Sequence, residues 1–280
     1  LPDGTNRVFV DGNNKRRCLG CASGEGIDTV IESIEFRNGY ADRGGGLYCL
    51  GSSPSLKDCV FDESTATTAG GGIYIEGGSP YIESCTVTNN ESSFGGGFYI
   101  RDSLATIAGG LVAGNQATNR GGGFRIVEAS PSVYDVQIQL NLAFRGGGAH
   151  IQQDCTPLFQ YCMIKQNTAD SLGGGMAHSI NSPAIYQNCT FIQNAATGDN
   201  GGQGSGGAVY SDGSSVLLES CHLLDNQAAT YGAGVYCWNS SPVLTDTTIQ
   251  NNVAGNSGGA IRTIGGSGPQ LISSNLLCQN

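Results

Sequence analysis

The sequence predicts an all-β fold, a right-handed parallel β-helix of about ten rungs with roughly 26 residues in each. Three observations predict it. Gly makes up 45 of the 280 residues, the glycines recur in triplets at a regular spacing, and short stretches between them alternate apolar and polar residues as strands do. The sequence contains no amphipathic stretch of ten residues that would suit a helix. We therefore expect short strands and turns stacked into a solenoid.

A glycine-rich phrase followed by an apolar residue recurs nine times. Its first glycines are Gly44, Gly70, Gly95, Gly121, Gly146, Gly173, Gly206, Gly232 and Gly258. Successive phrases start 25 to 27 residues apart, with one interval of 33. Glycine reaches positive φ without a clash and lets backbones approach closely, so we expect the phrase to turn the same corner in every rung. Two or three strands in each rung would suit this repeat, and rungs spaced by about 4.8 Å would give a length of about 50 Å.

Two further markers keep the same phase. A proline in an SP, TP or GP pair precedes an apolar stretch in seven repeats. Asparagine forms a column, which we expect to be an internal ladder of side-chain amides bonded to the rungs above and below. The column comprises Asn38, Asn90, Asn115, Asn141, Asn167, Asn194, Asn226, Asn252 and Asn280, with Ser64 in one repeat.

The regular repeat defines two parts of the chain. Residues 31–280 form the predicted β-helix, and the less regular residues 1–30 are expected either to cap it or to continue it. A glycine-rich insertion near 197–205 is expected to form a flexible loop at one corner. It is similar to a calcium-binding nonapeptide, but Ser205 replaces the ligand Asp, so no metal is expected. Without a recognisable C-terminal cap, we expect further repeats or end-to-end self-association.

Composition excludes several classes of function. Charged residues are 13 % of the chain, about half the usual share. The net charge of −10 argues against nucleic acid as a partner. No apolar run approaches the roughly 18 residues that span a bilayer, so no membrane insertion is expected. The 8 prolines are too few for collagen. No cofactor is expected either.

The strand after each glycine phrase places its middle residue outward, because alternate residues of a strand face opposite sides. These positions form what we call the outward column: Tyr48, Tyr74, Tyr99, Arg125, His150, Ala177, Tyr210, Tyr236 and Arg262. Trp238, the only tryptophan, lies two residues after Tyr236 and should share its face. We expect an exposed stripe that binds a glycan or a protein surface. The alternative is stacking between rungs that only favours the strand.

Five of the eleven cysteines occupy one position of the repeat: Cys59, Cys85, Cys162, Cys189 and Cys221. Gly110, Val136 and Thr247 occupy it elsewhere, so the position should be small and buried. We interpret the column as stacked core thiols. Disulfides between rungs stay an alternative, because the Cα spacing permits them although the Cβ spacing is unfavourable.

Three other polar positions carry separate expectations. Asn188 and Asn239 lie in N-x-Ser/Thr sequons and are candidates for glycosylation, with Asn239 in a turn. The sequon at Asn90 belongs to the internal column, where a glycan would not fit. His178 falls at an inward position and is expected to be a core group with satisfied hydrogen bonds.

The candidate catalytic residues are Tyr99, Arg125 and His150, consecutive members of the outward column. Such a group could supply acid–base chemistry and a cation that stabilises an enolate, as polyuronate cleavage or epimerisation needs. A polyanionic substrate also needs a basic cleft, and residues 146–280 hold only two Lys or Arg against seven Asp or Glu. We therefore expect no catalytic residues, with a lyase or epimerase of uronate-containing glycans as the alternative.

The repeat phrase, with its Pro, Cys, Asn and glycine markers, resembles repeats of bacterial right-handed β-helix surface proteins. It is also similar to the passenger region of chlamydial polymorphic membrane proteins, marked by GGA plus Ile, Leu or Val and by FxxN. Residues 206–209 and 258–261 match the first mark, and residues 191–194 match the second. The resemblance implies the β-helix fold and a role in adhesion at the cell surface. We therefore expect a non-catalytic extracellular structural or adhesive module, within a larger surface protein or fibre.

Overall fold

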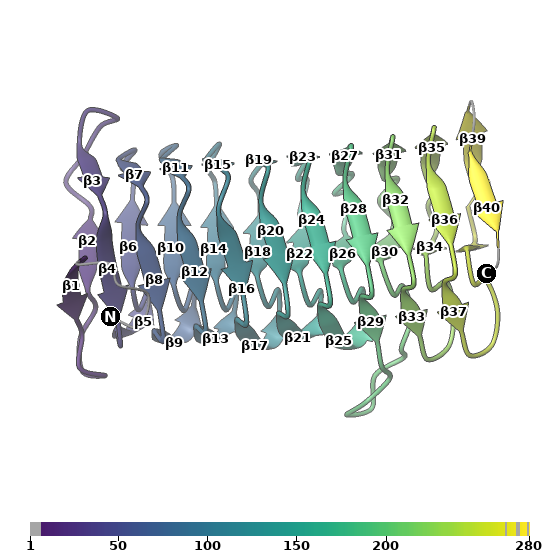
Figure 1. The fold of residues 1–280 in the computed structure, drawn as a ribbon, viewed down its shortest axis with the longest axis horizontal. Helices are drawn as coiled ribbons and strands as arrows, with labels where there is room; N and C mark the ends of the chain where they lie inside the picture. Colours follow the sequence, from purple (N-terminus) through teal and green to yellow (C-terminus); the bar gives the residue numbers. More distant parts are fainter. Residues whose placement is uncertain (1–6, 267, 273–274, 279) are drawn as a thin grey trace.

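The computed structural model describes residues 7–266, 268–272, 275–278 and 280, and these form a parallel β-helix (Figure 1). Forty short strands make four sheets in this part of the chain, and every sheet runs the length of the molecule. A turn therefore passes through four strands rather than the two or three expected. The strands are only two to five residues long, so one repeat has room for four.

Sheet A contains eleven strands, and its inward residues include Phe36, Phe61 and Val87. Phe36 and Phe61 stack with ring centroids 4.9 Å apart. The strands are β1 (Val8–Asp11), β4 (Ile34–Arg37), β8 (Val60–Asp62), β12 (Thr86–Thr88), β16 (Leu111–Ala113), β20 (Gln137–Gln139), β24 (Met163–Lys165), β28 (Thr190–Ile192), β32 (His222–Leu224), β36 (Thr248–Gln250) and β40 (Leu276–Cys278).

Sheet B follows the glycine corner and carries the outward column. Its inward residues, such as Ile73 and Ile75, are fully buried. The ten strands are β2 (Leu19–Cys21), β6 (Leu47–Leu50), β10 (Ile73–Glu76), β14 (Phe98–Arg101), β18 (Phe124–Val127), β22 (Ala149–Gln152), β26 (Met176–Ser179), β30 (Val209–Asp212), β34 (Val235–Trp238) and β38 (Ile261–Ile264).

Sheet C follows sheet B around the coil and places one apolar residue of each strand inside, such as Leu56 or Ile82. Its ten strands have three residues each. They are β3 (Val30–Glu32), β7 (Ser55–Lys57), β11 (Tyr81–Glu83), β15 (Thr106–Ala108), β19 (Ser132–Tyr134), β23 (Leu158–Gln160), β27 (Ile185–Gln187), β31 (Leu217–Glu219), β35 (Val243–Thr245) and β39 (Gln270–Ile272).

Sheet D lies between sheet A and the glycine corner, and it forms the lower row of strands in Figure 1. Isolated bridges continue it through Ser205, Tyr231 and Ser257 where its later strands are short. The nine strands are β5 (Tyr40–Arg43), β9 (Thr65–Ala69), β13 (Glu91–Phe94), β17 (Gln116–Arg120), β21 (Leu142–Arg145), β25 (Thr168–Leu172), β29 (Ala195–Ala196), β33 (Gln227–Ala228) and β37 (Val253–Ala254).

The glycine corner between sheets D and B turns as predicted. The first glycine of every phrase has positive φ, as at Gly146, where φ is 67°. The second glycine has no room for a side chain. A Cβ on Gly147 would lie 2.4 Å from the carbonyl oxygen of Thr168 and 2.5 Å from that of Gly174. Glycine therefore suits both the turn and the close approach of rungs, although Ala233 occupies the second position of the phrase that starts at Gly232.

The predicted asparagine ladder runs through the interior at the end of sheet A. Asn141 shows the pattern: its Nδ2 donates to Asn167 Oδ1 and to Val112 O, both at 2.9 Å. Its own Oδ1 accepts from the backbone N and the Nδ2 of Asn115, both at 3.0 Å. The same pattern links the consecutive asparagines from Asn90 to Asn280.

Asn38 is not a member of this ladder, and the prediction for it was wrong. The ladder position in that rung is held by Gly39, whose backbone N donates to Ser64 Oγ at 3.1 Å. Asn38 lies one residue earlier, and its amide donates to Asp11 outside the core. A side chain at position 39 would collide with the carbonyl of Gly45, so no asparagine fits the ladder position of this rung.

The N-terminal strands and the long loop complete the coil. β1, β2 and β3 pair with β4, β6 and β7, so residues 8–32 extend three of the sheets by one strand each. The loop after β29 projects from one corner (Figure 1), and it is anchored where Asn200 Nδ2 donates to Asp170 Oδ2 at 2.7 Å.

Candidate functional site

The outward column has the register that the sequence predicted. Tyr74 pairs with Tyr48 and Tyr99 on the neighbouring strands, and Arg125 pairs with Tyr99 and His150. The tyrosine rings stack from rung to rung, with centroids 5.4 Å apart for Tyr48 and Tyr74 and 5.1 Å apart for Tyr74 and Tyr99. The parallel register alone brings these residues together.

The expected exposure of this column was wrong for several of its members. Tyr74 is 2 % exposed, Arg125 5 % and His150 3 %, and Tyr236 is also buried. Two features account for this burial. The rings cover one another along the sheet, and side chains of sheet D lean over the column from the other side of the glycine corner. The column is therefore the floor of a groove.

The wall of this groove is a second column that the sequence reading missed. It consists of the residue immediately before each glycine phrase: Arg43, Ala69, Phe94, Arg120, Arg145, Leu172, Ser205, Tyr231 and Ser257. We call it the pre-glycine column. Its signal was visible as the sequence RGGG, which occurs three times, at residues 43–46, 120–123 and 145–148.

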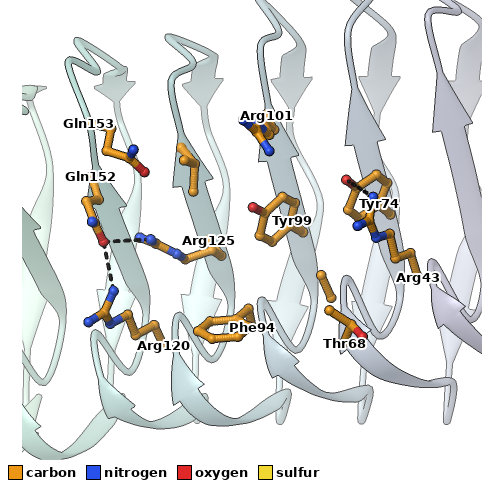
Figure 2. A pocket seen from close by; sticks show the side chains of 12 residues that line it. Arg43, Thr68, Tyr74, Phe94, Tyr99, Arg101, Arg120, Arg125, Gln152 and Gln153 are labelled. Atoms are coloured by element: carbon orange, nitrogen blue, oxygen red, sulfur yellow. Dashed lines mark hydrogen bonds between the residues drawn. The ribbon is translucent and has the colours of Figure 1, made fainter.

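The two columns enclose a cavity of about 460 Å³ between sheets B and D, which we call the basic pocket. Sheet D contributes Arg43, Phe94 and Arg120, and sheet B contributes Tyr99 and Arg125 among others (Figure 2). The pocket thus combines guanidinium groups with aromatic rings. All the arginines of this pocket precede residue 146, so the scarcity of Lys and Arg in residues 146–280 does not extend to it.

Two of these guanidinium groups are balanced by carboxylates. Arg43 lies 3.6 Å from Glu76, whose carboxylate also accepts a hydrogen bond of 2.6 Å from the Tyr74 hydroxyl. Arg101 lies 2.9 Å from Glu128 and 3.4 Å from Asp102. These pairs neutralise the side of the pocket nearer the N-terminus.

Arg120 and Arg125 have no such partner. Arg125 Nη2 donates to Gln152 Oε1 at 2.7 Å, and Arg120 Nη1 donates to the same oxygen at 2.9 Å (Figure 2). Arg125 Nη1 also lies 2.5 Å from His150 Nδ1, which accepts because guanidinium can only donate. Among the described residues, neither arginine forms an ion pair, so a neutral amide oxygen is the shared acceptor for two cations.

The candidate catalytic residues Tyr99, Arg125 and His150 do lie on adjacent rungs, but His150 is poorly placed as a base. Burial and the neighbouring Arg125 hold its pKa well below the usual value, and its Nδ1 is engaged. Burial and the nearby Arg120 also lower the pKa of Arg125 to about 10. The Tyr74 hydroxyl is also poorly suited as a base, because burial and its hydrogen bond to Glu76 raise its pKa.

A second cavity, of about 530 Å³, lies between the same two columns in later rungs. Tyr236, Trp238 and Arg262 line it from sheet B, and Tyr231 lines it from the pre-glycine column. Tyr210 and Tyr236 stack at 5.5 Å, and the Arg262 guanidinium lies 5.1 Å from the Tyr231 ring centroid. Trp238 is 42 % exposed, and residues 202–203 of the long loop close one side. We call this the aromatic pocket.

The other predicted positions lie outside the groove. Cys59, Cys85, Cys162, Cys189 and Cys221 are buried free thiols. His178 is buried as expected, with Nε2 2.8 Å from the Tyr186 hydroxyl and Nδ1 3.1 Å from Ser182 O. Asn188 and Asn239 are exposed, whereas Asn90 is enclosed in the ladder.

No cluster of three or more His, Cys, Asp or Glu side chains suited to a metal ion occurs among the described residues. In the same residues, no helix has the length and apolar character needed to cross a membrane.

The fold and its cavities define a class: a parallel β-helix with two cavities between sheets B and D. The family model described as the right handed beta helix region matches residues 45–206 and, overlapping them, 138–277. The chain belongs to this family, and the prediction of a right-handed β-helix is confirmed. No match is found among the curated proteins or among the solved structures. This fold serves both structural or surface modules and enzymes that act on polysaccharides.

Proposed function

We propose that this β-helix is a non-catalytic, extracellular or cell-surface module that binds a glycan along the groove between sheets B and D. One observation carries the proposal. Stacked rings and guanidinium groups of the outward column line both pockets, which follow one another along the solenoid. Aromatic faces and planar guanidinium groups are well suited to the apolar faces and hydroxyl groups of sugars. The rigid ladders on either side hold the groove in shape before a ligand binds.

Several features support the extracellular setting. The glycine phrases resemble those of surface adhesins, including the chlamydial passenger repeats, and the two candidate glycosylation sites are exposed. The net charge of −10 disfavours nucleic acid as the partner. A protein surface is the alternative occupant of the groove, and end-to-end association into a fibre is a separate proposal that electron microscopy would test.

The alternative function is cleavage or epimerisation of a uronate-containing glycan. The basic pocket favours it, because these reactions need a cation beside the carboxylate of the sugar. The environment of His150 disfavours it, because a base must be accessible and must gain a proton in the working pH range. The groove therefore supports binding better than turnover.

The test uses Trp238, the single tryptophan, as a reporter in the aromatic pocket. The protein is titrated with neutral and acidic oligosaccharides while its fluorescence is followed, and the mixtures are then assayed for unsaturated or epimerised sugars. We expect saturable fluorescence changes without turnover. Formation of product would establish the enzyme instead. Absence of any binding, together with filaments in the microscope, would favour a fibre subunit.

A further inference from the structure

The two unpaired arginines in the groove identify the class of ligand more closely. This inference rests on the proposed function, because it assigns a chemistry to one part of the same groove. Arg125 is 5 % exposed and Arg120 is half-buried, yet all the acceptors that they contact are neutral. Burial of a charge costs much free energy unless an opposite charge accompanies it.

A third arginine adds to the positive charge that no carboxylate balances. Arg145 follows Arg120 in the pre-glycine column, and the two strands pair at these residues. Its Nε is buried without a hydrogen-bond partner, and the pKa of Arg120 is lowered by burial and then by the charge of Arg145. Among the described residues Arg145 also forms no ion pair. Three arginines on two neighbouring rungs therefore form no ion pair among the described residues.

The geometry of this cluster points to a specific position for an anion. Arg120 and Arg125 approach from sheets D and B, on opposite sides of the glycine corner, and donate to one oxygen atom of Gln152. A pair of guanidinium groups converging on one oxygen is the arrangement that carboxylates and sulfates occupy in proteins. The amide of Gln152 occupies this position as a neutral acceptor, on a side chain that can rotate away.

We propose that Arg120 and Arg125 bind an acidic group of a polysaccharide, either the carboxylate of a uronic acid or a sulfate ester. Both groups present two or more oxygens that accept hydrogen bonds from guanidinium. The Tyr99 and Phe94 rings, which line the same pocket, would contact the sugar that carries the group. His150 is a positioning residue, because its Nδ1 fixes the guanidinium of Arg125 toward the pocket.

The groove would thus hold an acidic sugar in the basic pocket and an uncharged sugar in the aromatic pocket. Arg125 and Tyr236 are four rungs apart in the outward column, which corresponds to about 19 Å along the solenoid. A short stretch of an extended polysaccharide can span both pockets. The ligand expected is therefore an acidic polysaccharide rather than an isolated anion.

The experiment compares calorimetric titrations of the whole chain with polygalacturonate, dextran sulfate and neutral dextran. The variants are Arg120→Gln, Arg125→Gln and Arg125→Lys. Lys165→Gln, which removes a charge on the opposite sheet A, is the matched control. We expect the affinity for at least one acidic polymer to fall about tenfold or more in the two Gln variants and to be unchanged in the control. Arg125→Lys keeps the positive charge but loses the planar pair of guanidinium donors, so it should give an intermediate loss of affinity.

The outcomes separate this inference from the proposed function. Binding of polygalacturonate without dextran sulfate assigns the carboxylate, and the reverse assigns the sulfate. Equal affinity of the wild type and of both Gln variants for every acidic polymer that binds would overturn the inference. Binding of neutral dextran alone would also overturn it, while leaving the groove as a glycan site. No binding of any polymer would overturn both, and binding of nucleic acid or an acidic protein instead would reassign the groove.

A second measurement covers the case in which a variant folds poorly. The thermal midpoint of the wild type should rise with added polygalacturonate or dextran sulfate, because a ligand that binds only the folded state stabilises it. Arg120 is half-buried and accessible, so Arg120→Gln should fold and should lose most of this rise. An identical rise in Arg120→Gln and in the wild type would contradict the proposal.

Discussion

The interior of the coil and the groove on its side are built by the same repeat, yet they differ in sequence. Inside, most positions of the repeat keep one kind of residue, such as the ladder asparagines or the apolar residues of sheet B, with His178 and Ser211 as exceptions. In the groove, the corresponding positions change from tyrosine to arginine, histidine and alanine. Stacking of rungs explains the regular interior. It does not require the changes in the groove, so those changes point to recognition.

This comparison predicts that the ladder is the region most sensitive to substitution. Asn141→Ala removes four buried hydrogen bonds, so that polar groups of Asn115, Val112 and Asn167 each lose a partner in the core. We expect a loss of about 5 kcal/mol in the free energy of unfolding, measured by denaturant titration followed by circular dichroism. Asn256→Ala is the control, because Asn256 is exposed. Equal losses of unfolding free energy in Asn141→Ala and Asn256→Ala would contradict the prediction that the ladder is especially sensitive.

Two neighbours on one strand give the sharpest comparison of interior and groove. Phe98 is buried and stacks on Phe124 at 4.8 Å, whereas Tyr99 faces the groove. Phe98→Ala should lower the free energy of unfolding by about 4 kcal/mol. Tyr99→Ala should cost about 1 kcal/mol of stability while weakening glycan binding. A larger loss of stability for Tyr99→Ala would make the outward column a purely structural stack.

Because His178 is buried in the interior, we expect the stability of the fold to fall in acid. Burial lowers its native pKa to about 4, below the unfolded value of about 6.5. The unfolded chain therefore binds the proton first as the pH falls, so stability is full above about pH 6.5 and is lost toward pH 4. The loss should be roughly 3 kcal/mol.

Denaturant titrations at several pH values across this window measure the effect. In His178→Gln the dependence on pH should be weaker by that amount. His150 is also buried with a lowered pKa, so its contribution has the same sign and remains in the variant. An unchanged pH dependence in His178→Gln would show that His178 does not titrate there.

Substitution in the groove should change the stability of the fold least. Arg125→Met removes a buried cation that has only neutral partners, so the lost hydrogen bonds are offset by relief of desolvation and of repulsion from Arg120. We expect a free energy of unfolding within about 1 kcal/mol of wild type, measured as for Asn141→Ala. A loss of several kcal/mol would mean that the guanidinium is a structural element rather than a binding group.

The sequence alone determined the repeat, the glycine corner and the asparagine ladder. These features are periodic, and each depends on local backbone conformation or on contact with the same residue one rung away. The register of the outward column followed for the same reason. The sequence also placed the cysteine column and His178 inside. The sequence placed Asn38 in the ladder wrongly. The intervals between repeats vary by one or two residues, so an asparagine one residue before the ladder position cannot be distinguished from a ladder member by spacing alone.

Only the tertiary structure decided which residues face one another across the groove. The glycine corner brings Arg120 of sheet D beside Arg125 of sheet B, and the next rung adds Gln152 between them. Contact across a corner joins different positions of the repeat, and the repeat pattern does not show which of them meet. The side chains of sheet D and the stacked rings also bury the outward column, so the stripe that was expected to be exposed forms one side of a basic pocket.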